Sequence, residues 1–277
     1  MSDRTAVVVG GALAAACVLS SAPSARAAPP WVERHLTLPA ADWAFDFGLG
    51  IGHTSGPPDV TGVGVNAEMA VGLTSFVELG VRTGLRVGDP GERAVHGDEY
   101  GRLFDWQYFD GADGVIANPE VRVRGALVRE EVFELALEGR LIVPVEGNNA
   151  GALFGVPMMF HLGHRVRLDT GAYIPVVFGS GGPPGAPDHV STTVGVSLPI
   201  DVWIQASPRL WLGPMTGVEF FRVGQDGSQA ELSLGFGLGY QITHYLDFKT
   251  MLLFPTITQS RPGPDFGVGA GVEIRIE

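Results

Sequence analysis

The chain has 277 residues, a net charge of −12 and a mean hydropathy of +0.20. Its 45% hydrophobic content excludes a disordered chain, and its single cysteine excludes a disulfide framework. With 18 basic against 30 acidic residues, no nucleic-acid partner is expected. Lys249 is the only lysine, which is unusual for a surface that faces water.

Residues 1–27 are typical of a secretory signal peptide. Arg4 precedes an apolar run over 5–19, and the small residues of the sequence Ala25-Arg26-Ala27 fit a cleavage site near Ala27. The run is shorter than the roughly 20 residues of a membrane-spanning helix. Cys17 suggests a lipoprotein as an alternative, but Ala14-Ala15-Ala16 lacks the usual aliphatic residue. We expect cleavage, then a short periplasmic N-terminal segment at 28–40 and one domain at 41–277.

Beyond Pro39 the hydrophobic pattern has a period of two. In residues 43–51, for example, Trp43, Phe45 and Phe47 alternate with small or acidic residues. Strict alternation over this length predicts strands with two different faces. Twelve strands are expected, near 41–52, 61–73, 76–87, 114–127, 132–145, 153–162, 165–178, 189–205, 209–221, 230–242, 245–254 and 265–276.

The connections between these strands alternate between tight and long. Tight connections fall at 74–75, 128–131, 163–164, 206–208 and 243–244, and the longer ones are rich in Gly, Pro, Asp and Asn. Such alternation is typical of an all-β, up-and-down antiparallel barrel in an outer membrane, with short periplasmic turns and long outer loops. A soluble sandwich or barrel is the alternative. It would expose a face of Gly, Ser, Thr, Glu and Arg that makes a poor solvated surface, so we expect the apolar face to meet lipid.

The last strand carries a more specific signal. Phe266 to Ile276 alternates through Gly271, Ile274 and Ile276, and it resembles the assembly signal of bacterial outer-membrane β-barrel proteins, although it ends in Ile276-Glu277 where that class usually ends in an aromatic residue. The whole chain after the signal peptide resembles this porin-like class. The resemblance implies localisation in the outer membrane of a Gram-negative bacterium. It also implies outer-membrane lipid, lipopolysaccharide and the barrel-assembly machinery as partners.

If the apolar face meets lipid, the charged residues of strands two to seven line the lumen. Opposite charges at this spacing form cross-strand pairs, and the planar guanidinium suits carboxylates. The opposite wall offers Ser and Gly residues that leave room. Either a narrow aqueous path past fixed charges or a network that closes the lumen fits this pattern. The predicted lumen and selectivity residues are Glu68, Arg82, Arg86, Glu120, Arg122, Arg124, Glu138 and Arg140.

Six prolines fall one per strand in six consecutive predicted strands. Proline cannot donate to a strand ladder, so we expect bulges or locally unpaired wall at Pro119, Pro144, Pro157, Pro175, Pro199 and Pro214. Simple kinking is one interpretation, and a weakened lateral seam is the other.

No catalytic residue, metal site or cofactor is predicted. His189 and Ser191 are the only His/Ser pair at plausible spacing, and no Gly-x-Ser-x-Gly motif occurs. The expected function is a passive channel or transporter for small solutes with a charged lumen, narrowed at its mouth by the loop at 88–113. The alternatives are a structural or adhesive barrel acting through its outer loops and, third, a lipid-modifying enzyme.

Overall fold

The computed structural model describes residues 29–54, 60–87, 116–145, 150–180, 191–221, 223, 229–254, 257–258 and 266–277. The predicted signal peptide and the loop at 88–113 lie outside these ranges.

Thirteen strands account for most of the described chain. They follow the predicted ranges to within a few residues, because the period-two pattern begins and ends where the turn residues do. They are β1 (Trp43–Thr54), β2 (Val60–Gly72), β3 (Val77–Val87), β4 (Ile116–Arg129), β5 (Phe133–Ile142), β6 (Ala150–His161), β7 (Val166–Ser180), β8 (Ser191–Val194), β9 (Val196–Ser207), β10 (Leu210–Phe221), β11 (Gln229–Thr243), β12 (Leu246–Phe254) and β13 (Phe266–Ile276).

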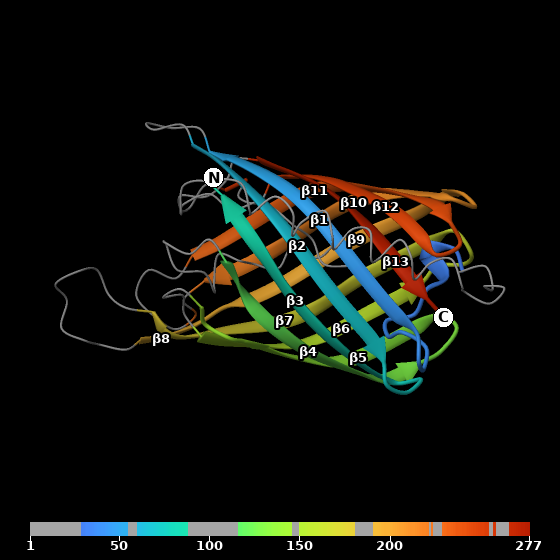
Figure 1. Ribbon diagram of the computed structural model, residues 1–277, viewed down its shortest axis with the longest axis horizontal. Coiled ribbons are helices and arrows are strands. Elements are labelled where there is room, and N and C mark those ends of the chain that lie inside the picture. Colours follow the sequence, from blue (N-terminus) through green and yellow to red (C-terminus); the bar gives the residue numbers. More distant parts are fainter. Residues whose placement is uncertain are drawn as a thin grey trace, which may run out of the picture.

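The strands form one closed antiparallel barrel. Each strand pairs with its neighbours in the chain, and β1 pairs with β13 to close the ring. β8 and β9 both pair with β7 and are separated only by Gly195, so they are two halves of one strand in a twelve-stranded wall. Figure 1 shows the strands tilted across the long axis of this barrel.

The two faces of the wall differ as the sequence predicts. Large apolar side chains such as Leu49, Val65, Leu137 and Phe154 are exposed on the outside. The inward positions between them are buried and mostly small or charged. Closure of the barrel pairs the backbone of every strand, which an apolar surrounding requires.

Five prolines lie beside gaps in the hydrogen-bonded pairing. At Pro119 the register between β3 and β4 shifts between Arg82 and Gly84. The β5–β6 pairing is interrupted opposite Pro157, and the β9–β10 pairing opposite Pro214. In the pairing of β7 with β8 and β9, neither Pro175 nor Pro199 has a register partner. The predicted bulges and gaps are therefore confirmed at these five prolines. The sixth, Pro144, follows the end of β5.

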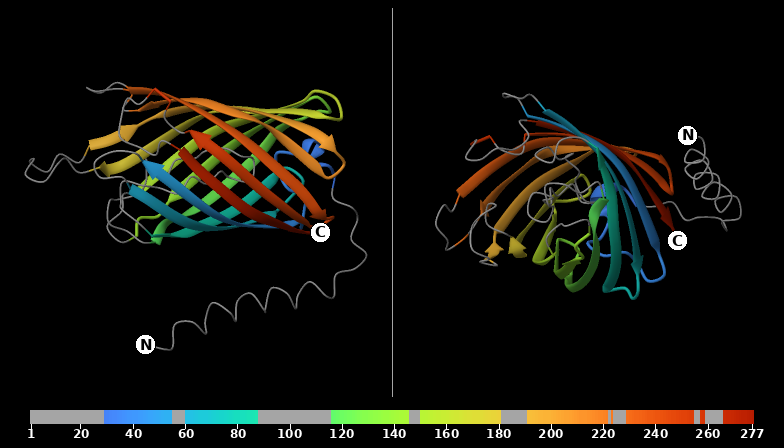
Figure 2. Two further views of the ribbon diagram at one scale, coloured as in Figure 1. Left: turned by 90° about the horizontal axis from the view of Figure 1, so that it is seen from above. Right: turned by 60° about the vertical axis from the view of Figure 1, so that its left-hand side comes forward.

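The described residues contain no helix long and apolar enough to cross a membrane. The 3-10 turn η2 (Trp31–Glu33) precedes β1. Figure 2 shows this segment inside the barrel, at the end where the tight turns and the C-terminus lie. The segment from 29 to 40, here called the N-terminal segment, therefore folds into the barrel end rather than standing ahead of it.

Candidate functional site

Charged side chains from β2 to β5 form cross-strand rows on the inner face. Register places Arg82 of β3 between Glu68 of β2 and Glu120 of β4. A second row has acid, base, acid in the order Glu78, Arg124, Glu138, and Arg122 lies opposite Arg140 between the two rows. The eight residues, here called the charge ladder, balance four carboxylates against four guanidinium groups. They are Glu68, Glu78, Arg82, Glu120, Arg122, Arg124, Glu138 and Arg140.

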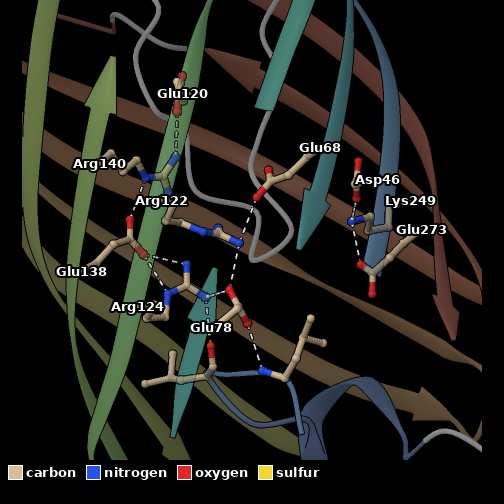
Figure 3. Close-up of polar contacts among 12 residues, drawn as sticks. Asp46, Glu68, Glu78, Glu120, Arg122, Arg124, Glu138, Arg140, Lys249 and Glu273 are labelled. Atoms are coloured by element: carbon tan, nitrogen blue, oxygen red, sulfur yellow. Dashed lines mark hydrogen bonds and ion pairs between the residues drawn. The ribbon is translucent and has the colours of Figure 1, made fainter. Parts of the chain in front are cut away.

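Ion pairs connect these rows into one chain (Figure 3). Arg122 Nη2 lies 2.9 Å from both Glu68 Oε1 and Glu78 Oε1. Arg124 donates from Nε to Glu138 Oε2 at 2.8 Å, and Arg140 donates from Nε to Glu138 Oε1 at 2.7 Å. Glu138 thus accepts from two guanidinium groups, and Arg140 Nη1 continues to Glu120 Oε2 at 3.3 Å.

The structure brings most of the predicted lumen residues together. Glu68, Arg82, Arg122, Arg124, Glu138 and Arg140 are buried on the inner face, and Glu120 is partly buried beside them. Arg86 lies opposite Gly64 in the β2–β3 register, but its side chain is outside what the structure describes. Glu78, a charged residue of the third predicted strand and therefore expected in the lumen, links Arg122 to Arg124, because its Oε1 lies 2.9 Å from Arg122 Nη2 and 3.6 Å from Arg124 Nη1. Its position in the alternating sequence Glu78-Leu-Gly-Val-Arg82 is the signal that places it on the same face.

A second cluster of charges lies on β1, β12 and β13, outside the predicted set. Lys249 Nζ contacts Asp46 Oδ2 and lies 2.9 Å from Glu273 Oε2, as Figure 3 shows. Register aligns Glu68, Asp46, Glu273 and Asp247 on consecutive strands, which makes a row of four carboxylates. Like charges opposite one another destabilise a sheet, so this row needs cations from elsewhere. Closure of β1 on β13 creates the row, and a strand-by-strand interpretation of the sequence does not show it.

The N-terminal segment supplies one of those cations. Arg34 Nη1 contacts Asp247 Oδ2 and lies 3.5 Å from Glu273 Oε1. Burial lowers the pKa of the Arg34 guanidinium, and Arg275 adds to this, while Asp247 and Glu273 raise it. Arginine keeps its proton under all of these influences. Arg34 therefore carries a fixed positive charge into the acidic row.

Backbone groups of the N-terminal segment bind the opposite side of the wall. The N–H of Leu36 donates to Glu134 Oε2 at 3.0 Å, and the N–H of Leu38 donates to Glu78 Oε2 at 2.9 Å. In return, Arg124 donates to the carbonyl of Leu36 at 2.9 Å, and Arg167 donates to the carbonyl of Trp31 at 2.8 Å. These contacts reach β3, β4, β5 and β7, so the segment crosses the lumen at the tight-turn end.

Apolar side chains of the same segment pack into three clusters on the wall. Trp31 and Val32 pack with Trp203, Trp211 and Met215. Leu36 packs with Ala136 and Met159, and Leu38 packs with Ala44 and Ala70. The chain approaches β2 so closely that a Cβ at Gly72 would lie 1.8 Å from the carbonyl oxygen of Pro39. Glycine is required at that position.

The wall of small residues does not leave the tight-turn end of the lumen open. A Cβ at Gly239 would lie 2.1 Å from the Trp211 ring, and one at Gly237 would lie 2.5 Å from the Trp203 ring. The expectation that small residues leave room is wrong at this depth, because the indole rings of Trp203 on β9 and Trp211 on β10 lie against these glycines. Neither wall of the predicted lumen included these two tryptophans, so they join the second charge cluster among the lumen residues that were not predicted from the sequence.

A cluster of histidines lies at the rim beside the N-terminal segment. His35 Nδ1 and His161 Nε2 lie 2.6 and 3.2 Å from the same oxygen, Glu134 Oε1. A surface hollow of about 330 Å³ opens beside them, lined also by Glu33 and His164. Within the described ranges, no three His, Asp or Glu side chains are arranged to hold a metal ion.

Comparison with known proteins defines the fold but no family. No family model matches the sequence, and no curated protein matches it. Among solved structures, an outer membrane channel from Pseudomonas putida F1 matches with a TM-score of 0.63 at 11% identity, over 91% of this chain and 100% of that one. The NanC porin matches with a TM-score of 0.54 at 7% identity, over 83% of this chain and 98% of that one.

A third match is the KdgM porin, with a TM-score of 0.51 at 10% identity over 83% of this chain and 98% of that one. The fold is that of outer-membrane porins and channels. The predicted class of protein is thereby confirmed at the level of the fold. Identities this low show the barrel architecture and leave the solute to be argued from the lumen itself.

Proposed function

We propose that this protein is a passive outer-membrane channel for small solutes, and that its charge ladder sets the preference between anions and cations. The observation that carries the proposal is the balanced chain of four carboxylates and four guanidinium groups on β2–β5. Fixed charges of both signs on one wall, with no net charge, favour a path for small polar or zwitterionic solutes over a strong filter for one ion.

We also propose that the protein is exported and inserted into the outer membrane. The signal-like residues 1–27 and the apolar outer surface fit an outer-membrane protein, with lipid and lipopolysaccharide around the barrel. The loop at 88–113 would narrow the outer mouth. The N-terminal segment narrows the other end, so solute flux is expected to be low while that segment is in place.

Planar-bilayer conductance of the refolded protein tests this function. The wild-type protein should give discrete current steps after a heat-sensitive gel mobility shift has shown that the barrel is folded. Arg140→Ala and Arg82→Ala each remove one positive charge from the ladder. Each should raise the permeability ratio of cations to anions by about two- to five-fold, because a unit charge at 4–10 Å contributes about 0.4–1 kcal/mol in water.

Arg209→Ala is the matched control, because Arg209 is exposed in the turn between β9 and β10. Its permeability ratio should equal that of the wild-type protein. Unchanged conductance and selectivity in both ladder variants would contradict the proposed role of the ladder.

The second candidate is a non-conducting barrel that acts through its outer loops. One observation favours it: the N-terminal segment binds several strands around the lumen, and the ladder residues beside it are buried. A folded barrel without current steps, both as wild type and after Trp31→Ala/Arg34→Ala, would support this candidate and overturn the channel.

A further inference from the structure

The indole of Trp31 occupies an aromatic pocket in the lumen, here called the slot, which side chains of the barrel wall form. Its ring stacks on Trp211 with centroids 5.0 Å apart and an interplanar angle of 3°. The Trp203 ring meets it edge-on at 6.2 Å and 77°. In addition, the Arg167 guanidinium carbon lies 4.8 Å from the centroid of the Trp31 ring. Trp31 is only 2% exposed, so the slot encloses a whole flat ring.

A cation site adjoins this slot. The Arg34 guanidinium carbon lies 5.3 Å from the Trp31 centroid and 5.9 Å from that of Trp211. The same guanidinium contacts Asp247 and Glu273. Glu68 of the carboxylate row is paired with Arg122 in the charge ladder. Without Arg34, the rest of the row has three carboxylates, on Asp46, Asp247 and Glu273, against two cations, on Lys249 and Arg275. The wall therefore lacks one positive charge at the point where Arg34 is bound.

Buried polar atoms of the wall retain capacity for a ligand. Asp247 Oδ1 and Trp203 Nε1 have no hydrogen-bond partner among the described residues. Both residues are at least nine-tenths buried. Since a buried polar atom without a partner is costly, a bound group that donates to Asp247 Oδ1 would stabilise the site.

The wall half of this site does not depend on the segment that fills it. Trp203, Trp211, Arg167, Asp247 and Glu273, here called the tryptophan seat, all lie on strands of the barrel. Every strand pairing that closes the barrel lies within residues 43–276. The seat therefore keeps its backbone frame when Trp31 and Arg34 are absent from it.

We propose that the tryptophan seat is a solute-binding site for molecules that carry a flat aromatic ring next to a cationic group, and that the N-terminal segment competes with such solutes for it. The segment itself presents this chemistry, an indole beside a guanidinium, and is held by stacking, cation–π contact and ion pairing. The inference rests on the proposed channel function and names the class of solute for it.

Tryptamine, an indole with an ammonium group, is the probe. Its binding is measured by titration calorimetry to the full chain refolded in detergent, as wild type and as Trp31→Ala/Arg34→Ala. The double variant should bind tryptamine about ten-fold more tightly or better, because the competing segment no longer fills the seat. Indole-3-propionate keeps the ring but reverses the charge, and propylamine keeps the charge without the ring. Each should bind the double variant at least about ten-fold more weakly than tryptamine does.

The matched control is Trp43→Ala/Arg209→Ala, which removes the same two residue types outside the seat and should bind tryptamine as the wild-type protein does. Asp247→Asn, added to the double variant, should weaken tryptamine binding about ten-fold, because the carboxylate charge is lost. Trp211→Phe, added in the same way, should weaken tryptamine binding by less than that, because an aromatic ring remains. Trp211→Phe keeps a ring, so it provides a result if Asp247→Asn does not fold.

Equal binding of all three probes, or no gain in the double variant, would overturn the proposal. Conductance is measured on the same preparations. Selective tryptamine binding without any current steps supports the seat and rejects the channel, whereas current steps without selective binding reject the seat alone.

Discussion

The two sides of the lumen are filled by different means. On β2–β5 long charged side chains fill the space and neutralise one another, so the charge ladder is complete within the wall. On β10 and β11 glycines line the wall, and the space beside them holds Trp203 and Trp211 together with Trp31 from the N-terminal segment. A small residue in a barrel wall therefore does not by itself indicate an open path. Large side chains from elsewhere in the chain can fill the space beside it.

The largest effect is expected at the centre of the charge ladder. Glu138→Ala leaves Arg124 and Arg140 without their shared carboxylate in a buried setting, and should lower the free energy of unfolding by about 3–5 kcal/mol. Urea unfolding of the refolded protein, followed by gel mobility, measures it. Glu131→Ala in the exposed turn before β5 should change the same quantity by less than about 0.5 kcal/mol. If Glu138→Ala lowered the free energy of unfolding by less than about 1 kcal/mol, the charges of the ladder would be stabilised by water rather than by one another.

A smaller effect is expected on the glycine side. Gly239→Ala places a Cβ against the Trp211 ring and should cost about 1–3 kcal/mol in unfolding free energy through overpacking. Gly139→Ala is the control, because a Cβ there meets nothing within 4 Å. Near-ultraviolet circular dichroism should show a clearly changed tryptophan signal for Gly239→Ala. The tryptophan signal of Gly139→Ala should equal that of the wild-type protein. Identical spectra and stabilities for the two variants would show that the ring does not lie on this glycine.

The smallest effect is expected where pairing is redundant. Arg275 contacts Glu273, which also binds Lys249 and lies near Arg34. Arg275→Ala should therefore cost less than about 1 kcal/mol in the same urea experiment, since two cations still face that carboxylate. If Arg275→Ala proved as costly as Glu138→Ala, the carboxylate row would depend on each of its cations separately.

Much of the wall follows from the sequence, because alternation reports on one strand at a time. The inward positions of Arg82, Arg122 and Glu138 follow from counting by two between turns. The order of the strands follows from the alternation of short and long connections. Proline positions also predicted where pairing would be interrupted, since the missing N–H is a local property.

The contents of the lumen were harder to predict. The carboxylate row of Asp46, Glu273 and Asp247 joins the first strand to the last two, so it exists only after closure. The residues before β1 carry no alternation, and their sequence alone predicted a short periplasmic segment ahead of the barrel. Nothing in Trp31 or Arg34 taken singly indicates that each has a complementary partner about 200 residues away.

Local periodicity and composition were enough to predict a signal peptide followed by a barrel with an apolar outside and a charged inside. They did not predict what occupies the tight-turn end of the lumen. There the chain's own Trp31 and Arg34 meet indoles and carboxylates from β9–β13, and that meeting depends on side-chain shapes and charges brought together only when the ring closes.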